Sequence, residues 1–233
     1  MLCSLEGRNL NEVLTSLHTH LRPKRYLEIG TWTGGSLALA SCASLAIDPH
    51  FGLATDVVTV KPVCALYQMT SDDFFGNHDP TQVLGGPIDL AFLDGLHLFE
   101  ALLRDFINTE KYCRRNSVIV LHDCIPPVLA WTPRTPPPGD AWTGDVWKVP
   151  LILRKYRPEL KIYPLDSPPS GVVLITNLDP ASSVLSGGYY DIVEEFRGLD
   201  LATLEPAVRA EVFRTMSTDL FETAEQLSHY FWL

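Results

Sequence analysis

Residues 26–36 read YLEIGTWTGGS, and this stretch decides the fold. Its first four residues are a short run of apolar residues and β-formers, which is typical of a buried strand. Gly30, Gly34 and Gly35 follow, and Ser36 precedes the helix-like sequence LALASCA. A strand, a glycine turn and a helix start make a cradle whose backbone N–H groups can hold a carboxylate or a phosphate. The alternative is a plain strand–turn–helix in which Ser36 only caps the helix.

A second landmark is the short run LAID, which ends in Asp48. An acid at the end of the second strand is where a doubly wound fold holds ribose hydroxyls. Together with the glycine turn, Asp48 indicates a nucleoside-containing ligand.

The rest of the chain alternates between strand and helix patterns. Such alternation predicts parallel strands joined by right-handed crossovers, with helices on both faces. Later, two closely spaced strands predict an antiparallel hairpin at the end of the sheet. We expect strands over 25–29, 45–48, 63–69, 88–93, 117–121, 160–165 and 171–176, and helices over 10–21, 35–44, 98–113, 189–197 and 205–230. The expected fold is therefore α/β, a doubly wound seven-stranded, mostly parallel sheet with a C-terminal antiparallel hairpin and a helical tail.

We divide the chain into a domain over 1–180, which includes the N-terminal helix, and a helical extension over 181–233. The extension packs on the same domain or on a partner subunit. Ser71 or Asp72 is expected to cap a short helix after the third strand, and Asp145 to cap the helix that follows it in the sequence.

Polar side chains stand at the ends of five consecutive strands of the predicted sheet. Ligands bind at the carboxyl ends of the strands in open α/β sheets, so these side chains indicate a functional site. They are Glu28 with Gly30, Asp48, Ser71 with Asp72, Asp94, and His122 with Asp123.

Composition narrows the class of protein. The 233 residues are 46% hydrophobic and carry a formal net charge of −10, which argues against a nucleic-acid or membrane-surface binder. The sequence has no apolar run long enough for a transmembrane helix and no signal-peptide pattern at its start. Five cysteines without CxxC spacing indicate reduced thiols, so we expect a cytoplasmic protein.

Residues 125–141 contain six of the chain's eighteen prolines. This segment cannot form a helix or a central strand. Because it leaves the fifth strand end, it is either a stiff flap over the site or a surface linker. Trp131 and Trp142 either wall a pocket or anchor the loop.

The strand order and the glycine turn resemble the class I S-adenosylmethionine-dependent methyltransferases. The turn EIGTWTGGS over 28–36 is similar to the E-[IL]-G-x-[YW]-x-G-x-S turn of the catechol and caffeoyl-coenzyme A O-methyltransferases. The resemblance covers residues 24–177. It implies S-adenosylmethionine as the cofactor, and Trp32 in place of a second glycine speaks against a nicotinamide enzyme.

The resemblance also implies roles for individual residues. Glu28 would hold the methionine amino end, Ser36 the methionine carboxylate, Asp48 the ribose hydroxyls, and Ser71 with Asp72 the adenine. The implied cofactor-binding set is Glu28, Gly30, Thr31, Trp32, Gly34, Ser36, Asp48, Ser71, Asp72 and Asp94.

The same resemblance implies catalytic and metal-binding roles for a second group of residues. His97 stands where the catechol branch keeps a catalytic lysine and would act as general base; Asp94 and His122 complete the catalytic set. Asp94 and Asp123 match metal ligands, but Cys124 replaces the usual Asn and suits magnesium poorly. A site for Mg or Mn would then consist of Asp94, Asp123 and either His122 or His97. The alternatives are that Asp94 caps a helix and that His122 packs under the flap.

The predicted function is methyl transfer from S-adenosylmethionine to a hydroxyl of a small molecule, such as a sugar or natural product, with or without a divalent metal. A metal-independent N- or C-methyltransferase, or a non-catalytic S-adenosylmethionine-binding subunit, is the alternative. The tail ending in HYFWL suggests a homodimer.

Overall fold

The computed structural model describes residues 2–139 and 141–232. Its centre is a seven-stranded sheet with the order β3-β2-β1-β4-β5-β7-β6. β1 to β5 run parallel, and β7 is antiparallel to both β5 and β6. The predicted fold class is confirmed. The strands are β1 (Arg25–Ile29), β2 (Ala43–Ile47), β3 (Cys64–Tyr67), β4 (Ile88–Leu93), β5 (Cys113–His122), β6 (Lys161–Leu165) and β7 (Val172–Thr176).

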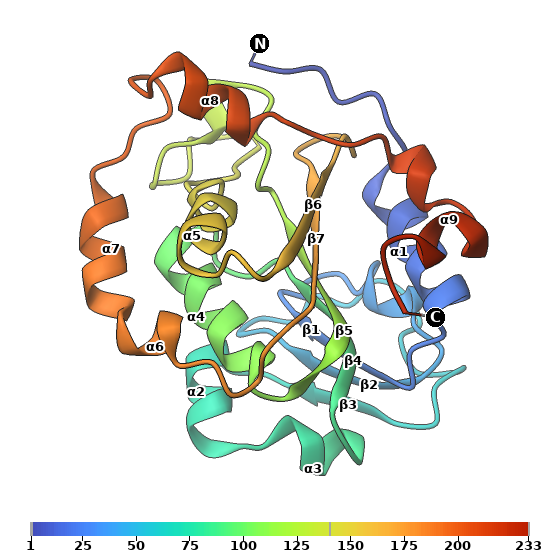
Figure 1. The fold of residues 1–233 in the computed structure, drawn as a ribbon. Helices are drawn as coiled ribbons and strands as arrows, with labels where there is room; N and C mark the ends of the chain where they lie inside the picture. The colour runs from blue at the N-terminus through green and yellow to red at the C-terminus, as the bar shows by residue number, and fades with distance from the viewer. Residues whose placement is uncertain (1, 140, 233) are drawn as a thin grey trace.

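Helices cover both faces of the sheet (Figure 1). One face packs against α2 (Ser71–Asn77), α3 (Pro80–Leu84), α4 (Phe99–Glu110), α5 (Lys148–Tyr156), α6 (Val184–Gly187) and α7 (Tyr189–Arg197). The other face packs against α1 (Leu10–Leu21), the short 3-10 turns η1 (Leu37–Leu39) and η3 (Thr218–Phe221), and α9 (Ala224–Ser228). A third 3-10 turn, η2 (Leu129–Trp131), lies in the proline-rich segment, and α8 (Pro206–Val212) packs near Trp147. Within the described residues, no helix combines the length and apolar character that crossing a bilayer requires.

Local sequence explains the elements that hold the site. β4 is apolar at every position except Asp89, and its last four residues are all buried, as expected for a strand covered on both faces. α1 begins with a capping box in which Asn9 and Glu12 satisfy each other's backbone N–H groups, and it buries Val13, Leu14 and Leu17 against the sheet.

The connection between β1 and β2 differs from the prediction. A crossover helix was expected over 35–44, but the structure has only η1 there, and β2 begins at Ala43, opposite Arg25. The connection over 30–42 consists of the glycine turn, η1 and the residues that lead into β2. α1 and α9 cover this face of the sheet instead, and both pack with η1 or η3. The helix expected after Ser36 is therefore absent, and the contact of Ser36 with a carboxylate stays a prediction.

Three further expectations need correction. β3 spans only Cys64–Tyr67, and the side chain that caps α2 is that of Thr70, which accepts from the Asp73 N–H. Asp145 does not cap α5; it caps α4 across space, because its Oδ1 accepts from the Phe99 N–H at 3.0 Å.

The tail over 205–230 is not one helix but α8, η3 and α9. Between α8 and η3 the chain runs along the edge of the sheet. There Met216 bridges to Leu165 and donates its N–H to the Pro164 carbonyl at 2.8 Å. This extended contact interrupts the helical pattern.

Candidate functional site

A cavity of about 830 Å³ lies at the carboxyl ends of β1, β2, β4 and β5. Its walls come from segments far apart in the sequence, as the parallel topology requires. Among its lining residues are Gly30, Thr31, Trp32, Ser36, Asp48, Ser71, Asp72, Asp94, His97, His122 and Asp123. The sequence-predicted residues therefore converge on one cavity, with the exception of Glu28 and Gly34.

The turn after β1 is fixed by close contacts. Gly30 has φ +84°, and a β-carbon there would collide with the Asp94 carbonyl, so only glycine fits. Trp32 also adopts a left-handed backbone, with φ 42°, while its ring is 69% exposed. Such strain in a non-glycine residue persists only when its surroundings enforce it.

Asp48 provides that enforcement. Its Oδ2 accepts from the Trp32 N–H at 2.8 Å, and its Oδ1 accepts from the His50 N–H at 2.7 Å. The side chain is nearly buried but still lines the cavity. Asp48 therefore organises the turn as well as offering lone pairs to a ligand.

Glu28 lies beneath the cavity and is fully buried. It accepts from the Tyr26 hydroxyl at 2.6 Å and from the Ser36 hydroxyl at 3.0 Å. Burial raises the pKa of Glu28 to about 7, although these hydrogen bonds act in the opposite direction. Ser36 thus lines the cavity while its hydroxyl is engaged by Glu28. Gly34 faces Leu53 and Val57 instead.

The far end of the cavity lies between α2 and α4. Asp72 pairs with Arg104, whose Nη2 is 2.7 Å from Oδ2, and the Ser71 hydroxyl donates to Asp105. Arg104 and Asp105 both line the cavity. Neither was identified from the sequence, because inside a helical pattern they look like ordinary surface positions.

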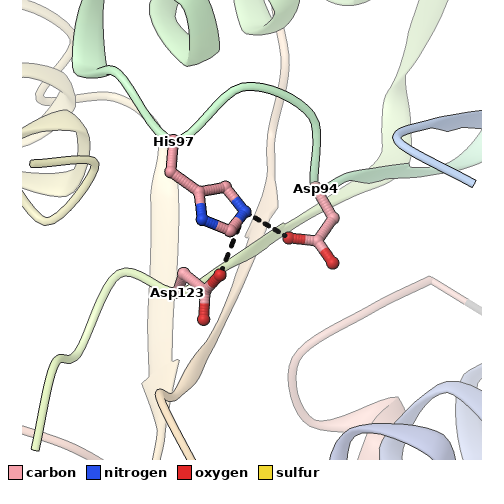
Figure 2. Close-up of side chains that lie close together, drawn as sticks. All are labelled: Asp94, His97 and Asp123. Atoms are coloured by element: carbon pink, nitrogen blue, oxygen red, sulfur yellow. Dashed lines mark ion pairs between the residues drawn. The ribbon is translucent and has the colours of Figure 1, made fainter. Parts of the chain in front are cut away.

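Two histidines and two aspartates meet at the opposite end of the cavity. His97 Nε2 lies 3.4 Å from Asp94 Oδ1 and 3.2 Å from Asp123 Oδ2 (Figure 2). His122 Nδ1 lies 3.2 Å from Asp94 Oδ1 and 3.6 Å from Asp123 Oδ1. Asp94 therefore contacts both imidazoles and does not cap α4.

The backbone fixes the tautomer of His97. Its Nδ1 lies 2.6 Å from the Trp142 carbonyl oxygen, which can only accept, so Nδ1 carries the proton. Neutral His97 then directs the lone pair of Nε2 at two carboxylate oxygens. Three acceptor atoms converging in this way need a proton or a cation between them, and Asp94, His97 and Asp123 have the donor types and spacing to hold a metal ion.

The pKa values reflect the same crowding of charge. Burial opposes protonation of both histidines, but Asp94 and Asp123 outweigh it, raising the pKa of His122 to about 9 and also raising that of His97. Burial alone would raise the pKa of Asp94, yet His122 and His97 lower it to about 2. Burial raises the pKa of Asp123. His122 and Asp94 therefore form an ion pair.

Trp142, which directly follows the proline-rich segment, contacts this end of the site. The Trp142 ring lies 5.0 Å from the His97 ring, and its Nε1–H donates to the Pro133 carbonyl at 2.6 Å. Arg134 pairs with Glu100 and with Asp145, which ties the segment to α4. None of residues 125–139 lines the cavity. The segment therefore buttresses His97 from outside.

Comparison with known proteins agrees with this geometry. A family model described as a methyltransferase domain matches residues 27–124, which run from β1 to the end of β5. This part of the chain is similar to a methyltransferase domain. No curated protein matches the sequence.

Solved structures share the fold of the methyltransferase domain at low sequence identity. The O-methyltransferase TomG of Streptomyces achromogenes, in complex with SAM, has a TM-score of 0.54 at 19% identity, covering 74% of this chain and 81% of that one. A Podospora anserina methyltransferase bound to SAH has a TM-score of 0.53 at 16% identity, with coverages of 71% and 76%. A Bacillus cereus O-methyltransferase in complex with SAH has a TM-score of 0.52 at 12% identity, with coverages of 75% and 83%.

Proposed function

We propose that the protein transfers a methyl group from S-adenosylmethionine to a hydroxyl group of a small molecule such as a sugar or natural product. The observation that carries the proposal is the meeting of His97, Asp94, His122 and Asp123 at one end of a cavity that Asp48, Ser71 and Asp72 also line. The structural relatives named above, two of them called O-methyltransferases, support it.

The cavity residues divide the work. The turn at Gly30 and Trp32 holds the methionine part of the cofactor, and Asp48 accepts hydrogen bonds from the ribose hydroxyls. The cavity walls align the acceptor with the methyl carbon, and alignment of two reactants supplies much of the rate of a displacement reaction.

His97 serves as the general base. The Trp142 carbonyl keeps the proton on Nδ1, so in neutral His97 the atom that can take the acceptor's hydroxyl proton is Nε2. Asp123 and Asp94 stabilise the imidazolium that this transfer creates.

The donor set fits a divalent metal, because two carboxylates and an imidazole suit Mn²⁺ and its neighbours better than an all-oxygen site would. Asp94, Asp123 and His122 would hold the ion, leaving His97 as base. The tight grouping of Asp94, His97 and Asp123 favours a second arrangement in which His97 is itself a ligand. A bound metal would supply Lewis-acid activation of the acceptor hydroxyl. The single lone pair of Nε2 makes the two roles of His97 exclusive.

The test uses methyl-labelled S-adenosylmethionine and a panel of sugars and phenols, each paired with its O-methylated form. We expect label transfer only to free hydroxyls. His97→Gln should lower turnover about 10²- to 10⁴-fold and leave S-adenosylhomocysteine affinity unchanged. His229→Gln, on an exposed histidine far from the cavity, is the matched control.

Manganese titration separates the two arrangements. If His97 is the base, His122→Gln loses metal affinity and His97→Gln keeps it; if His97 is a ligand, His97→Gln loses it. Binding of S-adenosylhomocysteine with no transfer to any acceptor, and no effect of His97→Gln on any reaction, would indicate a non-catalytic cofactor-binding subunit and contradict the proposal.

A further inference from the structure

Asp105 is a buried carboxylate on the cavity wall. It lies in the middle of α4 and is only 3% exposed. One oxygen, Oδ1, accepts from the Ser71 hydroxyl, whereas Oδ2 lies 3.5 Å from where a β-carbon on Gly95 would stand. No Lys, Arg or His among the described residues forms an ion pair with Asp105, since the neighbouring Arg104 is engaged by Asp72.

This arrangement lowers the stability of the folded state. A carboxylate removed from water without a cation or a full set of donors costs free energy, and here a single hydroxyl is the only side-chain donor. Burial accordingly raises the pKa of Asp105 to about 7. A tie between α2 and α4 would need only Oδ1. The second oxygen is left for a donor that arrives with a ligand.

The position of Asp105 identifies the part of the ligand that it meets. Asp48 lies at the end of β2 and Ser71 begins α2 after β3, so a nucleoside whose ribose lies at Asp48 extends its base toward Ser71. Gly95 and Ala101 line the cavity on the α4 side, where small side chains leave room for a flat ring.

We propose that Asp105 accepts a hydrogen bond from the exocyclic amino group of the cofactor's purine and thereby selects a 6-amino over a 6-oxo purine. The inference rests on the proposed function, since it takes the adenosyl group as the ligand. A 6-oxo purine would present a carbonyl to the carboxylate, and two acceptors facing each other in a buried site repel. A site built to bind an N–H rejects analogues that lack it more strongly than a hydrophobic pocket can.

The experiment measures affinities by calorimetry for S-adenosylhomocysteine and for its 6-oxo analogue, in which a carbonyl replaces the amino group. At a pH well above 7, where the Asp105 carboxyl with its pKa of about 7 is ionised, the wild type should prefer the 6-amino compound about ten- to a hundredfold, as expected for one hydrogen bond to a charged group. Asp105→Asn offers an amide N–H to the carbonyl, so the preference should vanish or invert. Ser71→Ala should weaken the binding of both compounds and leave the preference for the 6-amino compound unchanged. Asp191→Asn, on an exposed acid of α7, is the matched control.

The outcomes are distinct. If the wild type binds neither compound, the proposed function fails. If it binds both equally, or if Asp105→Asn keeps the wild-type preference, the inference fails although the function stands. If Asp105→Asn does not fold, Asp105→Ser replaces it, because it also lacks the carboxylate. The inference then requires that Asp105→Ser binds the 6-amino and 6-oxo compounds with similar affinity.

Discussion

The double role of Asp48 leads to a prediction in which a conservative substitution is damaging. Each carboxylate oxygen accepts one backbone N–H, from Trp32 and from His50. Asn can supply only one oxygen, so in Asp48→Asn an amide N–H faces a backbone N–H. A hydrogen bond to a charged group contributes about 1.5–3 kcal/mol, so we expect S-adenosylhomocysteine to bind about ten- to a hundredfold more weakly.

Two measurements check this reasoning. Calorimetry gives the affinity, and urea unfolding should show a loss of stability of similar size, because the left-handed Trp32 loses its support. An analogue that lacks the ribose hydroxyls separates the two roles. It should bind the wild type weakly, and Asp48→Asn should lower its affinity less than the affinity of S-adenosylhomocysteine. If Asp48→Asn binds S-adenosylhomocysteine as tightly as the wild type and unfolds at the same urea concentration, the account of this turn is refuted.

Two other predictions concern the cradle and the fold. Gly30→Ala should abolish cofactor binding and lower the melting temperature, because its β-carbon collides with the Asp94 carbonyl at positive φ; normal binding in calorimetry would contradict this. Burial, with a smaller effect from Lys61, lowers the pKa of His18 from 6.5 to about 4, so the folded state favours neutral His18. The contribution of His18 to the free energy of unfolding is fully present above pH 6.5. It falls by up to about 3 kcal/mol as the pH drops toward 4. Urea unfolding at both pH values should show that His18→Phe loses less stability in acid than the wild type does. Parallel pH profiles of stability for the two proteins would contradict this prediction.

The sequence was most informative where one residue type does one local job. The mostly apolar residues of β4 and the helical spacing of apolar residues in α1 predicted both elements with correct bounds. The end of each parallel strand could be located to within about two residues, and Asp48, Asp94 and Asp123 could be placed at one cavity without knowing any distance.

The incorrect predictions have a common cause: the contact that decides the structure is made with a residue far away in the sequence. Residues 37–42 favour a helix locally, but β2 begins at Ala43, which pairs with Arg25, and only the 3-10 turn η1 forms before it. Asp145 looks like a cap for the helix that follows it and instead caps α4. Asp105 could not be distinguished from a solvent-facing helix residue until α2 was placed beside α4.

The missing helix between β1 and β2 has a consequence for the order of events during synthesis. Phe221 and Leu227, from the end of the chain, complete the layer behind Tyr26 and Leu37. A nascent chain that has emerged as far as β5 already holds every strand of the cradle, yet the part of one sheet face that α1 does not cover is still open to water. Acquisition of a tightly held ligand should therefore wait until η3 and α9 have left the ribosome.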